Sequence, residues 1–340
     1  MRFLFIDTSE RIGGAGIAAA AWAGSLRRRG FEVAAYVTND QNHAMRRHWL
    51  DAGVPTTRGR ITLQRDTVAI FNTSLAARLV AQLSRQAPVV WLFHQGFSGL
   101  RGLAEQPDIA EICRRVRAFV FETEMQRRDL FRPFMLGVPE SRVHVVPPAA
   151  LVLANPPERE AEHRPTLRVV SVGAIGGRKR QDDLLLALAR LNRSDVSCDL
   201  VGRVGELSPE ALAAARSLSD RLRFLGEVTH PEALAAISAS DALALPSDDE
   251  SLPRSVLEAG ALGKVLVLSD LPAYRGLWQH GRNCLLHPVG DPELLALSLR
   301  ILLEDKALRL RLGDAARQTA HSFKLDLFQS RLDIVLGSLD

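Results

Sequence analysis

The stretch 240–286 most constrains how this chain can fold, because it reads as a strand, an acidic loop, a helix and a second strand. Residues 242–245 form the first apolar run. Pro253 suits the first turn of a helix, where its missing N–H is not needed. Apolar side chains at helical spacing then follow until Gly263, a residue that often ends helices. Residues 265–268 form the second strand, so the sequence predicts a βαβ unit of an α/β protein.

Two carboxylates flank the start of this helix. Glu250 lies in the acidic loop and Glu258 lies inside the helix. Open α/β sheets bind ligands at the carboxyl ends of their strands, and the N–H groups of a helix start favour anions such as phosphate. The pair alone is also typical of two solvated carboxylates, since 24% of the chain is charged.

The surrounding residues make the pair specific. The segment from Pro246 resembles the signature of the retaining glycosyltransferases of family 4, also called glycosyl transferases group 1, which runs roughly P-S-x-x-E-G-x-x-x-x-x-x-E-A-x-A-x-G-x-P-V-V-x-S-D. The matching residues are Pro246, Ser247, Glu250, Glu258, Ala259, Ala261, Gly263, Val267, Ser269 and Asp270.

The resemblance implies the GT-B fold, in which two Rossmann-like α/β domains face a central cleft. It also implies transfer of a sugar from a nucleotide-diphosphate donor. Glu258 is then expected to hold the ribose hydroxyls, and Glu250 to act as a catalytic residue near the transferred sugar. The helix start is expected to bind the donor diphosphate through Ser251, Leu252, Pro253 and Arg254.

A glycine-rich basic loop follows the predicted strand 167–172. Gly173 lets the backbone approach a ligand, and Arg178 and Lys179 place cations where a diphosphate would need them. The family carries a basic G-R-L…K-G motif here, in which Lys179 matches the lysine while Ala174 stands at the arginine position. The resemblance therefore makes these residues, with Gly202 after the next strand, candidate donor-binding residues.

The first strand, 2–7, leads into another glycine-rich turn. Gly14 to Ala19 fit the dinucleotide fingerprint G-x-G-x-x-A, and Asp40 ends the following strand, as an NAD-binding protein would require. A lone fingerprint is weak, because any tight turn between a strand and a helix favours glycine. The same residues resemble the family's opening GGA segment, in which Gly14 would contact the donor or acceptor.

His94 follows the predicted strand 88–93 and so lies on the ligand-binding edge of its sheet. It reads equally as a loop histidine with a local hydrogen bond. The resemblance favours a catalytic role, because a family histidine after this strand contacts the donor sugar or its phosphate. Gln95 stands where the family often has Asp.

The chain is long enough for two domains. We expect an acceptor-binding Rossmann-like domain at 1–153, a Pro-rich linker at 154–165 and a nucleotide-sugar-binding domain at 166–320. Residues 321–340 are expected to form a C-terminal helix that crosses back to the first domain, as in GT-B folds.

Charge and composition narrow the function classes. Residues 1–160 carry a net charge of +6, in clusters such as Arg27–Arg29, whereas residues 161–340 carry −2. This is compatible with peripheral contact with an anionic membrane surface, and no nucleic-acid-binding module accompanies it. The apolar runs fall short of the roughly 20 residues of a membrane helix. Three scattered cysteines suit a reducing cytoplasm, and no metal motif is present.

Taken with these observations, the resemblance implies a cytoplasmic, metal-independent, retaining glycosyltransferase of the hexosyltransferase type that needs no cofactor beyond its nucleotide-sugar donor. By resemblance its acceptor is a glycan or a lipid-linked molecule in bacterial polysaccharide or glycolipid assembly. Three alternatives stay open: a GT-B protein that binds a sugar nucleotide without transfer, an epimerase of the same fold, and an NAD-dependent oxidoreductase.

Overall fold

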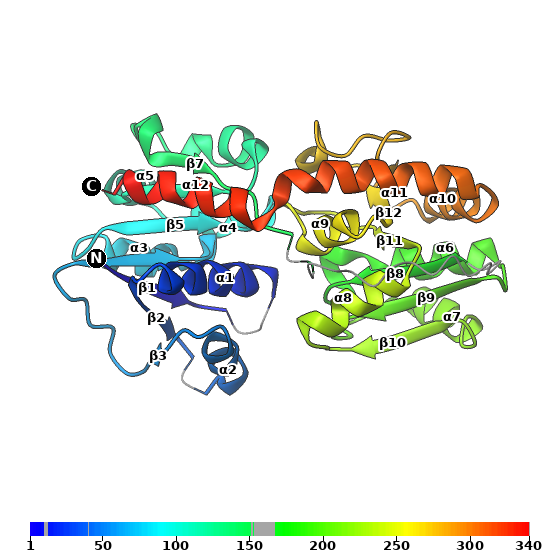
Figure 1. The fold of residues 1–340 in the computed structure, drawn as a ribbon, viewed down its shortest axis with the longest axis horizontal. Helices are drawn as coiled ribbons and strands as arrows, with labels where there is room; N and C mark the ends of the chain where they lie inside the picture. Colours follow the sequence, from blue (N-terminus) through cyan, green and yellow to red (C-terminus); the bar gives the residue numbers. More distant parts are fainter. Residues whose placement is uncertain (10–12, 40, 151, 153–166, 340) are drawn as a thin grey trace. The chain divides into compact units, whose positions relative to one another are not determined.

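The computed structural model describes the chain except residues 10–12, 40, 151, 153–166 and 340 and the side chains at 101–102. The chain divides into two compact units, each drawn in Figure 1. The N-terminal unit comprises Met1–Ala149 and Leu325–Asp340, and the C-terminal unit comprises Ala150–Lys324. The predicted boundary at 153 and the predicted linker 154–165 lie outside the described residues.

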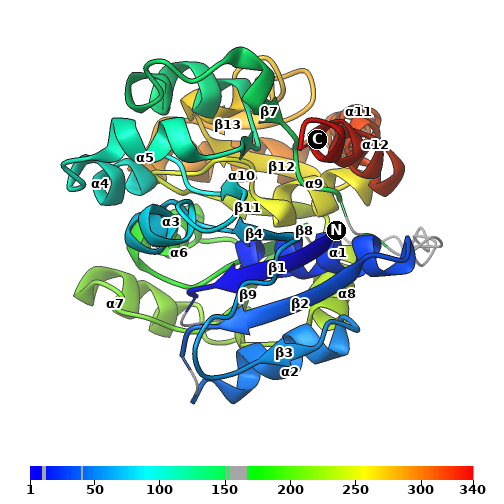
Figure 2. The same cartoon turned by 90° about the vertical axis from the view of Figure 1, so that its left-hand side faces the viewer.

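The N-terminal unit is built on a parallel sheet with the strand order β3-β2-β1-β4-β5-β6-β7. Figure 2 shows β3, β2 and β1 side by side in this sheet. The strands are β1 (Arg2–Asp7), β2 (Glu32–Val37), β3 (Thr56–Thr57), β4 (Thr67–Phe71), β5 (Val89–Phe93), β6 (Ala118–Phe121) and β7 (Val143–Val145). The helices are α1 (Gly14–Arg28), α2 (His43–Asp51), α3 (Ala77–Leu83), α4 (Ser98–Ala104), α5 (Ile109–Arg115) and α12 (Leu325–Gly337).

Alternating side chains of the central strands give the N-terminal sheet two apolar faces. On one face the rings of Phe93, Phe121 and Phe131 pack together, with the Phe93 and Phe131 centroids 4.5 Å apart. The residues between them in the strands, Leu92 and Val120, point to the other face. Both faces are buried, as parallel sheets require.

The C-terminal unit has a second parallel sheet, with the order β10-β9-β8-β11-β12-β13. This order is that of a Rossmann sheet. The strands are β8 (Leu167–Val172), β9 (Val196–Val201), β10 (Leu222–Gly226), β11 (Ala242–Leu245), β12 (Val265–Ser269) and β13 (Leu285–His287). The helices are α6 (Gln181–Leu191), α7 (Pro209–Ser217), α8 (His230–Ala239), α9 (Arg254–Ala261), α10 (Pro292–Glu304) and α11 (Lys306–Ala320).

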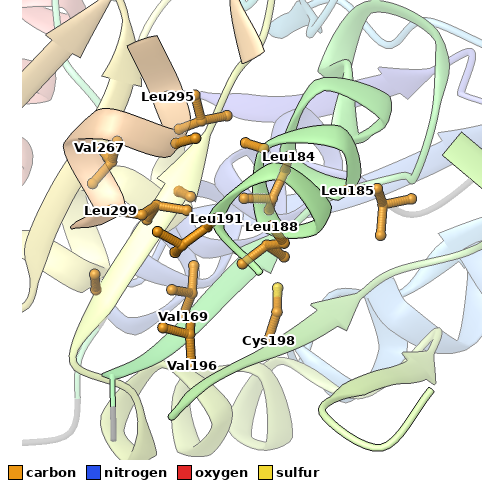
Figure 3. Packing of buried hydrophobic residues seen from close by; sticks show 14 of the residues in the cluster. Val169, Leu184, Leu185, Leu188, Leu191, Val196, Cys198, Val267, Leu295 and Leu299 are labelled. Atoms are coloured by element: carbon orange, nitrogen blue, oxygen red, sulfur yellow. The ribbon is translucent and has the colours of Figure 1, made fainter. Parts of the chain in front are cut away.

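The core of the C-terminal unit forms where α6 covers its sheet. Figure 3 shows Leu184, Leu188 and Leu191 of α6 gathered with Val169 of β8 and with side chains of α10. These leucines recur at intervals of three and four residues, the spacing that keeps one helix face on a core. The buried core fixes the strands, so the loops at their carboxyl ends start from rigid positions.

The two Rossmann-like units confirm the predicted α/β fold class. After β6, residues 124–125 are helical and Gln126–Leu130 continue as a single π-helical turn. The Gln126 side chain accepts a hydrogen bond from the N–H of Glu122, directly after β6. Pro133, which has no N–H, lies in the 3₁₀ turn Arg132–Phe134 that follows.

Candidate active site

The C-terminal sheet reverses its strand order between β8 and β11, which are neighbours in the sheet. Ligands bind open α/β sheets at such a point, beyond the carboxyl ends of the strands. The loop after β8 carries the predicted basic residues, and the loop after β11 carries the predicted acidic ones. The sheet topology therefore brings together two segments that lie about 70 residues apart in the sequence.

Glu250 is the centre of this site. Its Oε1 accepts hydrogen bonds from Lys179 Nζ at 2.5 Å and from Ser247 Oγ at 2.7 Å. Its Oε2 lies 3.1 Å from Arg178 Nη1. The Glu250 side chain is 6% exposed and that of Lys179 is 15% exposed, whereas Arg178 is 48% exposed. The site thus holds one buried carboxylate between one shielded cation and one cation that is open to solvent.

Two further hydrogen bonds, one between backbone groups and one from a side chain to the backbone, join the two loops. The Asp248 N–H donates to the Arg178 carbonyl at 2.9 Å, and Arg178 Nη1 donates to the Asp249 carbonyl at 2.5 Å. These bonds hold the basic and acidic loops in register before any ligand arrives. Such preorganisation is what a site needs when charge develops during a reaction.

The charges of this cluster stabilise one another. Burial alone would raise the pKa of Glu250, but Lys179 and Arg178 outweigh it and hold the pKa below its ordinary value. Burial lowers the pKa of Lys179, and the nearby Glu250 opposes that effect. Burial opposes the charge on Arg178 as well, yet Glu250 raises its pKa overall. An ionised Glu250 thus neutralises one of its two cationic neighbours, and the remaining positive charge can attract an anionic ligand.

Two predicted glycines shape the backbone of the site. Gly173 has φ +147°, and a Cβ there would lie 3.2 Å from Lys179 Cε, so the glycine makes room for the lysine stem. Gly202 has φ +138°, and a Cβ there would lie 2.0 Å from the Gly173 carbonyl oxygen. Gly202 is thus required by the close approach of two backbones, whatever contact it makes with a ligand.

Glu258 has a separate set of partners. It lies in α9, is 4% exposed, and its Oε1 is 2.8 Å from His230 Nε2 and 3.1 Å from Arg254 Nη2. Arg254 is one helical turn before Glu258, and His230 begins α8. The predicted residue Arg254 is therefore directed at Glu258.

The start of α9 differs slightly from the prediction. Pro253 is not in the first turn but at the N-cap, because its ψ of 126° is extended, and Arg254 is the first helical residue. Ser251 and Leu252 precede it and are 5% and 3% exposed. The helix start thus lies directly beside the acidic loop, as the sequence predicts.

In the N-terminal unit, His94 follows β5 as predicted. Its Nδ1 lies 2.7 Å from Glu122 Oε1, and both side chains are about nine-tenths buried. Both residues line a small pocket whose other walls include Trp22, Leu92 and Val120.

The structure does not show why glycine stands at position 14 in the glycine-rich turn of the N-terminal unit. Gly14 is the first residue of α1, and a Cβ there would meet nothing within 4 Å, so local packing does not require glycine. Asp40 of the NAD fingerprint lies outside the described residues. The role of Gly14 stays a prediction.

Sequence reasoning missed three polar residues at these sites, Glu122, Gln126 and His230, and it assigned no role to Ser247. A signal existed for Glu122, which directly follows a predicted strand next to the one that His94 follows. Ser247 stands in the recognised motif. His230 could not be found, because nothing in the sequence links α8 to Glu258.

Among the described residues, no three His, Cys, Asp or Glu side chains lie close enough to hold a metal ion. Within the same part of the chain, every helix is too short or too polar to cross a bilayer.

The C-terminal half of the chain is similar in sequence to a known family. Residues 157–319 match the family model of glycosyl transferases group 1. The phosphatidyl-myo-inositol mannosyltransferase of Mycolicibacterium smegmatis is 32% identical over 158 residues, covering 46% of this chain and 40% of that protein. The D-inositol 3-phosphate glycosyltransferase of Jonesia denitrificans is 26% identical over 237 residues, covering 64% and 55%. The chain thus spans about half the length of these relatives.

Solved structures match over the whole chain. HepE of Anabaena, solved with UDP and glucose, has a TM-score of 0.82 at 19% identity, with full coverage of both chains. A sucrose-phosphate synthase of Thermosynechococcus elongatus has a TM-score of 0.73 at 16% identity, covering 100% of this chain and 99% of that one. Both likenesses concern the fold. Residues 157–319 are therefore similar to glycosyl transferases group 1, and the chain has the two Rossmann-like domains of a GT-B fold.

Proposed function

We propose that this protein is a retaining glycosyltransferase that moves a hexose from a nucleotide-diphosphate sugar to an acceptor. The observation that carries the proposal is the cluster of Glu250, Lys179 and Arg178 at the switch point of the C-terminal sheet. The match of residues 157–319 to the family model of glycosyl transferases group 1 supports it.

The charges of the cluster suit this chemistry. When the glycosidic bond of the donor breaks, negative charge develops on the leaving diphosphate, and preorganised cations stabilise it. Lys179 and the more exposed Arg178 supply such cations, together with the N–H groups at the start of α9. These groups can do the work that a metal ion does in other transferases, so we propose a metal-independent reaction.

The carboxylates have distinct proposed roles. Glu250 binds hydroxyls of the transferred sugar, and Glu258 binds the ribose hydroxyls of the nucleotide. Ribose would then take the place of Arg254 or His230 as a hydrogen-bond partner of Glu258. If Arg254 is the partner displaced, its guanidinium would then lie beside the donor.

Related proteins indicate which donors and acceptors to test first. HepE was solved with UDP-glucose, so UDP-hexoses are the first donors to test. Two relatives are named for inositol-containing acceptors, one of them a phospholipid. We propose an acceptor that is a glycan or lipid-linked molecule of bacterial glycan or glycolipid assembly, reached by a cytoplasmic protein at the inner membrane face.

The test is release of nucleoside diphosphate from UDP-, GDP-, ADP- and TDP-hexoses, with phosphatidylinositol vesicles and inositol phosphate as first acceptors. One donor should react, and Lys179→Met should lower kcat/KM by about 100-fold. Glu304→Gln, an exposed carboxylate on α10, is the matched control and should change nothing. The coupling constant of the new anomeric proton, measured by NMR, should report the same configuration as in the donor.

Each alternative predicts its own result. A binding protein would bind the donor without releasing diphosphate, and an epimerase would convert the donor without any acceptor. Equal rates in wild type and Lys179→Met would contradict the proposed site.

A further inference from the structure

The pair formed by His94 and Glu122 follows from the register of two strands. Phe93 of β5 lies opposite Phe121 of β6, so the next residue of each strand emerges at the same edge of the sheet. The atoms Nδ1 of His94 and Oε1 of Glu122 are 2.7 Å apart, a short and strong hydrogen bond. The side chains are only 10% and 9% exposed.

Gln126 holds both partners in place. Its side-chain oxygen accepts from the N–H of Glu122 at 2.7 Å and of Thr123 at 3.0 Å. Its side-chain nitrogen donates to the carbonyls of Phe93 at 3.2 Å and of Gln95 at 2.8 Å. Gln126 is fully buried, so one amide fixes the backbone on either side of the pair.

The surroundings argue against a purely local role for the pair. Both residues line the pocket of the N-terminal unit, whose walls are otherwise mostly apolar and include Phe328 and Leu332 of α12. In an apolar setting a hydrogen bond between ionisable groups is strengthened, because water competes less for it. Ligand pockets in proteins typically have mostly apolar walls with a few polar groups placed among them.

We propose that Glu122 is a positioning residue for His94. The Glu122 carboxylate accepts a hydrogen bond from the Nδ1–H of His94. This bond fixes the Nδ1–H tautomer and the orientation of the ring. Nε2 is then the hydrogen-bond acceptor of the ring, and because this atom is buried, a hydroxyl of the donor sugar can reach it only after the pocket opens. A carboxylate orients catalytic and metal-bound histidines by the same physical means. The part concerning the sugar rests on the proposed function, whereas the tautomer does not.

The first test is spectroscopic and needs no substrate. Long-range ¹H–¹⁵N NMR of protein labelled at histidine, at pH 8, reports the tautomer of each neutral ring, and His94→Ala assigns the signal. Wild type and Glu122→Gln should show the Nδ1–H form, because both offer an oxygen acceptor. Glu122→Ala should shift the population toward the Nε2–H form. A majority Nε2–H form in wild type or Glu122→Gln, or an unchanged tautomer in Glu122→Ala, would overturn the pairing.

The second test is kinetic. Glu122→Ala should lower kcat by roughly 10- to 100-fold with a smaller change in KM, and Glu122→Gln should restore most of the loss. In a protein that already carries His94→Ala, Glu122→Ala should cause no further loss of kcat. The control is Glu124→Ala, an exposed neighbour paired with Arg127. An equal loss on both backgrounds would assign Glu122 a role other than positioning His94. Absence of transfer in the wild type would overturn the proposed function, while the NMR result would still decide the pairing.

Discussion

At the scale of single residues, Glu250 shows how two cations stabilise a buried carboxylate. It is buried between Lys179 and Arg178, and its carboxyl has a lowered pKa because those cations outweigh the effect of burial. Removing one member of a buried charge cluster leaves the others uncompensated, which destabilises a protein. Glu250 therefore serves the fold as well as the proposed reaction.

The lowered pKa of Glu250 gives the first prediction. A carboxyl whose pKa is lower in the folded state stabilises the protein above its unfolded pKa, and loses that effect as pH falls through the folded value. Glu250→Gln should lower the free energy of unfolding by about 2 kcal/mol at pH 7. Urea titrations should show this difference shrinking below about pH 4.5, the ordinary pKa of Glu. A difference that grows on acidification contradicts the assigned charges.

The partners of single residues were only partly predictable from the sequence. The motif located Glu250, Lys179 and Glu258, because spacing and residue type carry that information. It could not show that His230 contacts Glu258, since that contact depends on how α8 packs in the unit. Nor could it show that Glu122 contacts His94, which needed the register of β5 and β6.

At the scale of elements, the loops after β8 and β9 touch through their backbones. The carbonyl of Gly173 lies where a side chain of Gly202 would begin, so these two loops can approach only if residue 202 is glycine. This contact holds the basic loop against its neighbour, and the basic loop carries Lys179.

Gly202→Ala is the prediction at this scale. The new Cβ would lie 2.0 Å from an oxygen at a φ that side chains avoid, so unfolding free energy should fall by about 3 kcal/mol. Gly14→Ala is the matched variant, because its Cβ would enter open space, and it should shift stability by less than about 0.5 kcal/mol. Thermal or urea unfolding measures both. An equal loss of unfolding free energy in the two variants would contradict the steric requirement for glycine at position 202.

Most strands were predictable because buried parallel strands appear as short apolar runs. The expected strands 2–7 and 167–172 agree with β1 and β8. The two-residue strand β3 carries no such run, and its pairing with β2 is tertiary. The π-helical turn at Gln126–Leu130 depends on buried side-chain hydrogen bonds, which no local pattern reveals.

At the scale of the whole molecule, charge is distributed unevenly along the chain, with a net +6 in residues 1–160. A basic surface binds anionic membranes through charge, and salt screens that attraction. We expect binding to vesicles that contain phosphatidylinositol at low salt, and loss of binding at about 0.5 M salt. Co-sedimentation measures this. Absence of binding at low salt would contradict peripheral membrane contact, while leaving the donor site unaffected.

The central claim is that the C-terminal unit binds a nucleotide sugar through Glu258. The most direct measurement is the thermal shift of wild type and Glu258→Ala with UDP-, GDP-, ADP- and TDP-sugars and with NAD. A ligand at 100 times its dissociation constant adds about 2.7 kcal/mol, a shift of several degrees. The account predicts a shift with one sugar nucleotide that Glu258→Ala abolishes. A shift with NAD alone, unchanged in Glu258→Ala, would contradict it and place the ligand at the turn that contains Gly14.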